Sequence, residues 1–181
     1  MMNIENRQSP QNSQPSLYSS LVQVLEDLAV LYGNLLGILQ SEKSYLIRAE
    51  IEKLTENNRT KEATLFKIRN EDRRRQKVAS ELAKTLGLPP EELRLLEIAK
   101  KLKGAEAETL RVIHKTLSMQ IERAADFNRE NEEYAQSALR TLDGAIKDIQ
   151  QIVSVKPTYG SKGQMAGSHE SNSGNFVSKE A

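Results

Sequence analysis

The sequence predicts an all-α protein: an antiparallel hairpin of two long helices, a short helix and a long third helix. Together they would form an elongated, coiled-coil-like bundle with disordered termini. Apolar residues recur at spacings of three and four over long stretches, which is the helical period, and no strand pattern interrupts them. Leu, Ala, Glu, Lys and Arg dominate, Trp is absent and aromatic residues make up 4% of the chain. This composition is typical of long or coiled helices.

The termini are predicted to flank a single helical domain. Residues 1–15 are polar, contain two prolines and lack the apolar stretch of a signal peptide, so we expect a disordered arm. The helical domain is expected over residues 16–156, and residues 157–181, rich in Gly and Ser, as a flexible tail. No run of about eighteen apolar residues stands out, so we expect no membrane span and a cytoplasmic protein.

The first long helix is expected at about 17–48, with Ser16 as its N-terminal cap. Two neighbouring apolar rows run along it, so it should contact at least two other helices. The main row consists of Leu17, Leu21, Val24, Leu28, Leu31, Leu35 and Ile38, and the flanking row of Leu25, Tyr32, Leu39 and Leu46. Gly33 and Gly37 form a pair of small residues that indicates close helix packing.

A turn near 48–50 separates the first helix from a second at about 51–86. The main row, continued past Ala49, reaches only Glu52, Glu56 and Arg59, whereas a new apolar row begins at Ile51. A turn at 57–58 has better local turn residues but gives arms of unequal length, so the first position is favoured. The new row also passes through polar residues, which are costly if buried alone, so the hairpin needs a third element. These residues are Asn58, Lys61, Asp72 and Arg75.

Two further helices follow. Gly87 and the prolines after Leu88 end the second helix, and Pro90 with two glutamates is a suitable first turn for a short helix at about 90–103. A long third helix is expected at about 105–155, between Gly104 and Pro157. Its position relative to the hairpin is left open.

Charge and chemistry exclude several classes of function. Lys and Arg number 26 and Asp and Glu 25, a balance that disfavours nucleic-acid binding. The chain has no Cys and two His, far apart in sequence, so we expect no metal site, no cofactor and no catalytic residues. His114 is expected to flank a helix interface. The protein is therefore not expected to be an enzyme.

The end of the third helix is the candidate site. Two adjacent apolar rows occur there, and either both pack on the hairpin or one receives a helix from a protein partner. The candidate binding residues are Leu139, Leu142, Ala145, Ile146, Ile149, Ile152 and Val153.

The chain resembles the FlgN family of flagellar export chaperones over about residues 17–164. The resemblance rests on Glu42, Lys43, Ser44, Tyr45, Leu46, Ile51, Leu54, Lys61, Leu65, Ile68, Arg74, Leu82, Leu86, Gly87, Leu88, Asn128, Asn131 and the Tyr-Gly tail at 158–163. The family often has Gly-Asp at the first turn, where this chain has Ala49-Glu50.

The resemblance implies a cytoplasmic chaperone for the C-terminal helical segments of hook–filament junction proteins. It would keep these clients from assembling prematurely and deliver them to the flagellar type III export apparatus. The family's client-binding region is its last helix, which maps onto the seven candidate residues. Two alternatives stay open: a structural coiled-coil scaffold that forms a homodimer, and a chaperone for another client such as flagellin or the filament cap. The sequence identifies neither the client nor the oligomeric state.

Overall fold

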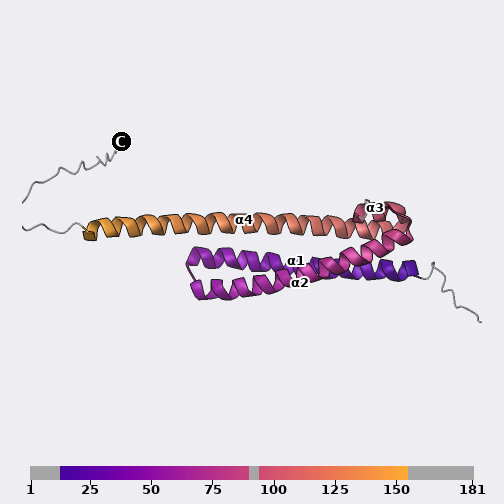
Figure 1. Ribbon diagram of the computed structural model, residues 1–181, viewed down its shortest axis with the longest axis horizontal. Coiled ribbons are helices and arrows are strands. Elements are labelled where there is room, and N and C mark those ends of the chain that lie inside the picture. Colours follow the sequence, from indigo (N-terminus) through magenta and orange to yellow (C-terminus); the bar gives the residue numbers. More distant parts are fainter. Residues whose placement is uncertain (1–12, 90–93, 155–181) are drawn as a thin grey trace, which may run out of the picture. The chain divides into compact units, whose positions relative to one another are not determined.

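The computed structural model describes residues 13–89 and 94–154, which form four helices (Figure 1). They are α1 (Ser13–Arg48), α2 (Ile51–Thr85), α3 (Leu95–Lys101) and α4 (Gly104–Ser154). The all-α class is confirmed, with a hairpin of long helices, a short helix and a long last helix. The expected arm falls mostly on residues 1–12 and the expected tail on residues 157–181, both outside the described residues.

The chain divides into two compact units, Met1–Ser137 and Ala138–Ala181. The described part of the first unit holds α1, α2, α3 and the beginning of α4, up to Ser137. The described part of the second unit is the helical segment 138–154. Each unit is described by itself.

The hairpin turn lies at Ala49-Glu50, the first of the two predicted positions. The Ala49 amide donates to the Leu46 carbonyl at 3.2 Å and the Glu50 amide donates to the Tyr45 carbonyl at 3.0 Å. This bond pair is the Schellman motif, whose left-handed residue is usually glycine. Here Ala49 occupies that position with a φ of 54°, which costs roughly 1–2 kcal/mol for a residue with a Cβ.

The end of α2 has the same motif with glycine in place. The Gly87 amide donates to the Lys84 carbonyl at 3.1 Å and the Leu88 amide donates to the Ala83 carbonyl at 2.9 Å. Gly87 has a φ of 69°, which glycine adopts without a steric cost. Leu88 and Ala83 are both buried, giving the apolar contact that often accompanies the motif.

Three predicted details are wrong. The first helix begins at Ser13, so Ser16 lies inside α1 rather than capping it, because Pro15 is tolerated in a first helical turn. The short helix begins at Leu95 after an extended Arg94 with a ψ of 141°, and it ends at Lys101. Ile51 is 66% exposed, since it directly follows the hairpin turn.

The core of the first unit is built around α1. Its fully buried side chains meet buried residues of all three other helices, such as Leu82, Ile98 and Leu110. The buried leucines and valine of α1 are Leu21, Val24, Leu25, Leu28, Leu35 and Leu39. By length and composition α1 is also apolar enough to cross a membrane, contrary to expectation, but a helix at the centre of a soluble core passes the same test.

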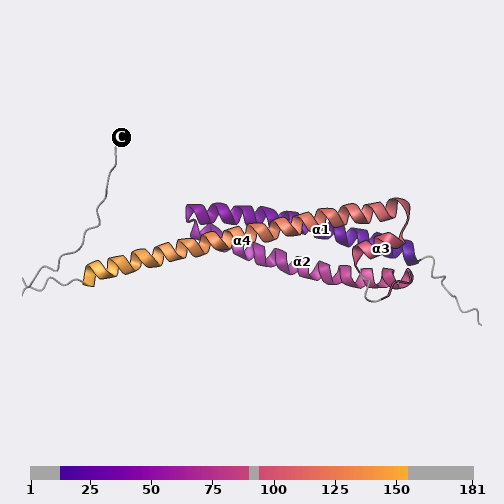
Figure 2. The ribbon, with the colours of Figure 1, turned by 90° about the horizontal axis from the view of Figure 1, so that it is seen from above.

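The third long helix packs along the hairpin within the first unit. The Tyr18 hydroxyl donates to the Glu106 carbonyl at 3.3 Å, and Asn131 Nδ2 donates to the Leu39 carbonyl at 2.8 Å. Because the partner numbers rise together, α4 runs parallel to α1, and both lie along α2 in this unit (Figure 2). Of the predicted small pair, Gly33 lies near the Gln120 side chain, whereas nothing lies near the Cβ position of Gly37.

Candidate functional site

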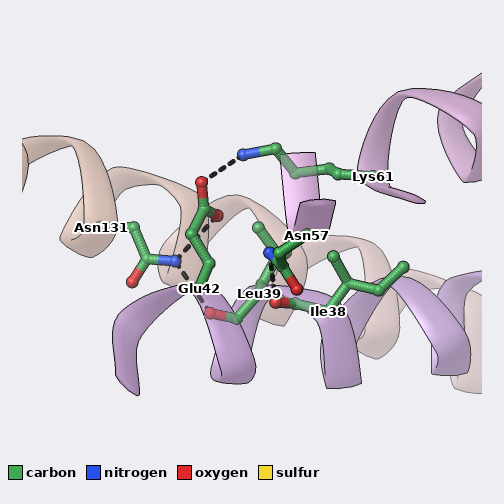
Figure 3. Close-up of polar contacts among 6 residues, drawn as sticks. All are labelled: Ile38, Leu39, Glu42, Asn57, Lys61 and Asn131. Atoms are coloured by element: carbon green, nitrogen blue, oxygen red, sulfur yellow. Dashed lines mark hydrogen bonds and ion pairs between the residues drawn. The ribbon is translucent and has the colours of Figure 1, made fainter. Parts of the chain in front are cut away.

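A buried polar cluster joins α1, α2 and α4 (Figure 3). Asn131, only 3% exposed, donates from Nδ2 to the Leu39 carbonyl at 2.8 Å and to Glu42 Oε2 at 3.1 Å. Glu42 is 7% exposed, and its other oxygen accepts from Lys61 Nζ at 2.6 Å. A buried carboxylate is costly unless paired and hydrogen-bonded. The cluster meets this requirement with one residue from each helix.

Three of the four polar residues predicted along the second helix form ion pairs. Lys61 binds Glu42, and Arg75 Nε donates to Asp72 Oδ1 at 2.7 Å. Beside the cluster lies a groove of about 330 Å³ between α1, α2 and α4. Its lining includes Leu46, Leu54, Asn58, Asn128, Asn131 and Ala135.

The two asparagines that marked the family resemblance have different environments. Asn128 is exposed at the groove, whereas Asn131 is buried and its Oδ1 atom has no hydrogen-bond donor in the structure. Both partners of Asn131 Nδ2 are acceptors, so the orientation of the amide is fixed by chemistry. An unsatisfied buried acceptor costs about 1–3 kcal/mol. Asn131 therefore adds little to the stability of the fold, and its main effect is to fix the position of α4 against α1.

An exposed ion pair accompanies the cluster. Lys43 Nζ lies 2.7 Å from Glu130 Oε2. The hydrogen bond from Lys43, and then its charge, hold the pKa of Glu130 below its usual value. Exposed pairs of this kind contribute little stability, so the pair mainly favours the observed alignment of α1 with α4.

A second cleft of about 200 Å³ lies where the four helices of the first unit meet. Leu25, Leu28, Leu95 and Leu117 are among its apolar lining residues, with the half-buried Tyr32 and His114. Burial, and then the charge of Asp72, raise the pKa of Tyr32. His114 lies beside the α4 interface, as predicted. Among the described residues, no group of three or more His, Cys, Asp or Glu side chains is arranged to hold a metal ion.

The candidate binding residues lie in the second unit and share one face of α4. We call them the terminal stripe: Leu139, Leu142, Ala145, Ile146, Ile149, Ile152 and Val153. Every residue from 138 to 154 is exposed. The large side chains of the stripe are 62% (Leu139), 58% (Leu142), 52% (Ile146), 60% (Ile149), 74% (Ile152) and 76% (Val153) exposed. Neither apolar row is buried in this single chain.

The terminal stripe is broad and continuous. At 100° per residue, its members and Ala138 span an arc of about 140° around the helix. Gly144 and Gln151 fall on the opposite side. Contiguous apolar surfaces of this kind occur at protein or membrane interaction sites and in ligand-binding grooves, and they also promote aggregation. The arrangement offers binding area and holds no assembled set of catalytic groups.

Sequence reasoning did not anticipate the buried ion pair, although a signal was present. Glu42 follows Leu21, Leu28 and Leu35 at seven-residue intervals and therefore occupies a core row of α1. A carboxylate in such a row requires a partner from a neighbouring helix. Lys61, on the row of the second helix, is the cation that the antiparallel hairpin brings opposite.

One of the comparisons with known proteins identifies a family. Residues 17–167 match the sequence profile described as FlgN protein. Neither a curated protein nor a solved structure matches the chain. The match covers most of the chain, including the hairpin and α4. The chain therefore belongs to the FlgN family of flagellar export chaperones.

Proposed function

We propose that this chain is a cytoplasmic chaperone that binds the C-terminal helical segments of hook–filament junction proteins on the terminal stripe of α4. It keeps these clients from assembling prematurely and delivers them to the flagellar export apparatus. The observation that carries the proposal is the exposure of both apolar rows at the end of α4. Membership of a chaperone family supplies the class of partner.

The energetics suit a client that must later be released. Each of the six large aliphatic side chains contributes about 1.5–3 kcal/mol when fully buried. Since they are 52–76% exposed in the free chain, covering them releases roughly 6–11 kcal/mol before the cost of association. That cost is about 4–15 kcal/mol. The stripe alone therefore supports binding that is reversible rather than permanent.

The proposed mechanism is the covering of an apolar surface. A client that polymerises through amphipathic helices exposes those helices before assembly, and exposed apolar surface associates with itself. A helix of the client that lies on the terminal stripe is unavailable for polymerisation. This role requires surface complementarity and no catalysis.

The double variant Leu142→Asp, Ile149→Asp tests the proposal. It places two charges at the centre of the terminal stripe and should abolish binding of a purified junction protein in calorimetry while leaving the helical circular dichroism unchanged. Gly144→Asp, Gln151→Asp is the matched control, since it adds the same charge with the same seven-residue spacing on the opposite face. An unfolded Leu142→Asp, Ile149→Asp variant would show that the stripe belongs to the core and would refute the proposal.

The strict three-and-four spacing of Leu139, Leu142, Ile146, Ile149 and Val153 also favours a second candidate, a homodimeric coiled-coil scaffold. Such a scaffold buries the stripe in the dimer and has negligible affinity for foreign helices. Sedimentation of the free chain at micromolar concentration separates the two. A stable dimer that dissociates when Leu142 and Ile149 are replaced supports the scaffold. Parallel titrations with flagellin and with filament-cap protein test for a different client, which would bind more tightly than the junction protein.

A further inference from the structure

We infer that the terminal stripe receives two helices of one client lying side by side, rather than a single helix. This inference rests on the proposed function, because it concerns the form of the client at the same surface. It is carried by the register of α4, by the helices that cover α4 in the first unit, and by the width of the stripe.

The first step is the register of α4. Leu110, Leu117, Ala124 and Asn131 follow one another at seven-residue intervals and are 0%, 8%, 7% and 3% exposed. The same interval continues to Ala138, Ala145 and Ile152, all of which are exposed. The row that α4 buries in the first unit thus continues through the terminal stripe without a break in the sequence.

The second step is what covers this row in the first unit. Asn131 is held by Leu39 and Glu42 of α1, and Glu42 is in turn paired with Lys61 of α2. The groove beside Asn131 is lined from both helices of the hairpin, with Leu46 on α1 and Leu54 on α2. Two helices, not one, therefore enclose this face of α4. A partner that continues the same packing along the same row presents a pair of helices.

The third step is the width of the terminal stripe. A single helix that packs by knobs into holes uses a narrow seam, here Leu139, Leu142, Ile146, Ile149 and Val153. Ala138, Ala145 and Ile152 lie outside this seam, on one edge of the arc. Ile152 is 74% exposed, and a single partner helix would leave much of that surface uncovered. A stripe wider than about 100° is typical of a helix that faces a protein core, whereas a single coiled-coil partner needs only the narrower seam.

The two edges of the stripe differ in a way that suits two helices. Ala138 and Ala145 are small, so one client helix can approach the α4 backbone closely there, and Ile152 gives it an apolar contact at the end of the same edge. The other edge carries larger side chains, Leu139 and Ile146, which hold a second helix further away. A second copy of this chain is a poorer occupant, because its terminal stripe supplies a single helix, which packs on the seam and leaves the edge at Ile152 uncovered.

Three consecutive positions provide the test. Ala145→Asp places a charge on one edge, Ile146→Asp on the other, and Gly144→Asp on the opposite face of the same turn. Binding of the intact, purified hook–filament junction protein is measured by calorimetry with the full chain. We expect Ala145→Asp and Ile146→Asp each to weaken binding at least tenfold, and Gly144→Asp to change it less than twofold.

Hydrogen–deuterium exchange of the client in the complex tests the same inference without depending on affinity. We expect two separate client segments to be protected, one of them lost with Ala145→Asp and the other with Ile146→Asp. Protection of only one client segment would overturn the inference. So would an Ala145→Asp variant that binds the client within twofold of the wild type while Ile146→Asp weakens binding. Either result leaves the proposed function standing. A wild-type chain that binds no junction protein refutes both.

Two results would identify a different occupant of the terminal stripe. A free chain that sediments as a dimer, and becomes monomeric with Ala145→Asp, identifies a second copy as the occupant. A chain ending at residue 164 that binds the client at least tenfold more tightly identifies the chain's own C-terminal residues. Either result overturns the inference.

Discussion

The two parts of α4 carry the same apolar row in opposite environments. Up to Asn131 the row is buried against the hairpin, and from Ala138 onward it is exposed. Sequence alone gives the second part the richer apolar pattern, because Leu139, Ile146 and Val153 form a second apolar row beside this one. The comparison shows that apolar periodicity predicts a surface to be covered, and does not say whether the cover belongs to the same molecule.

The largest expected effect is on the free energy of unfolding, which the same substitution should lower far more in the buried part of α4 than in the exposed part. Leu110→Asp places a charge at a site that is 0% exposed and should lower the free energy of unfolding by more than about 4 kcal/mol. Leu142→Asp makes the same chemical change at a site that is 58% exposed and should cost less than about 0.5 kcal/mol. Urea unfolding followed by circular dichroism measures both. Equal losses would contradict the distinction.

The next effect concerns the polar cluster at the end of the buried part. Lys61→Met leaves Glu42 buried without its cation and should cost about 3 kcal/mol. Glu42→Leu combined with Lys61→Met removes both charges and should recover part of that loss. Denaturant titration of the two variants measures the difference. A double variant less stable than Lys61→Met would show that Glu42 stabilises the fold even without its cation, through its hydrogen bond with Asn131.

A smaller effect distinguishes the two Schellman turns. Ala49→Gly relieves the left-handed alanine at the hairpin turn and should stabilise the first unit by about 0.5 kcal/mol, after the entropy that glycine adds to the unfolded chain. Gly87→Ala introduces the same strain at the end of α2 and should destabilise it by about 1 kcal/mol. Thermal unfolding measures both changes. A destabilising Ala49→Gly would mean that Ala49 is not strained in solution.

The smallest expected effect lies beyond the terminal stripe. Removal of residues 165–181, which are polar and rich in Gly and Ser, should leave client affinity within twofold of the full chain. Isothermal titration of the two proteins with the same junction protein provides the comparison. A large loss of affinity would extend the binding surface beyond α4.

Much of the fold could be predicted because the helical period and the residues that end helices are local properties of the sequence. The phase change after Ala49 located the hairpin turn, and Gly87 located the end of α2. The start of α3 was misplaced because the prediction relied on the first-turn preference of Pro90, whereas the helix begins at Leu95 after an extended Arg94. The placement of α4 beside α1 depends on contacts between residues about ninety positions apart, which periodicity cannot supply.

The position of the candidate site along the chain could be predicted from the sequence, but its exposure could not. The spacing of Leu139 to Val153 identified an apolar face, and the exposure of that face required the structure. The role of Asn131 was only partly visible. Its resemblance to a family asparagine singled it out, whereas its partner Glu42 became meaningful only when the antiparallel hairpin brought Lys61 opposite.

Hydrogen–deuterium exchange of this chain, free and with a junction protein bound, tests the central claim most directly. A helix without tertiary packing is marginally stable, so we predict fast exchange of residues 138–154 in the free monomer and slow exchange when the client is bound. The amides of the buried part, from Leu110 to Asn131, should be protected in both states. Protection of residues 138–154 in the free monomer, or no gain of protection on binding, would contradict the account.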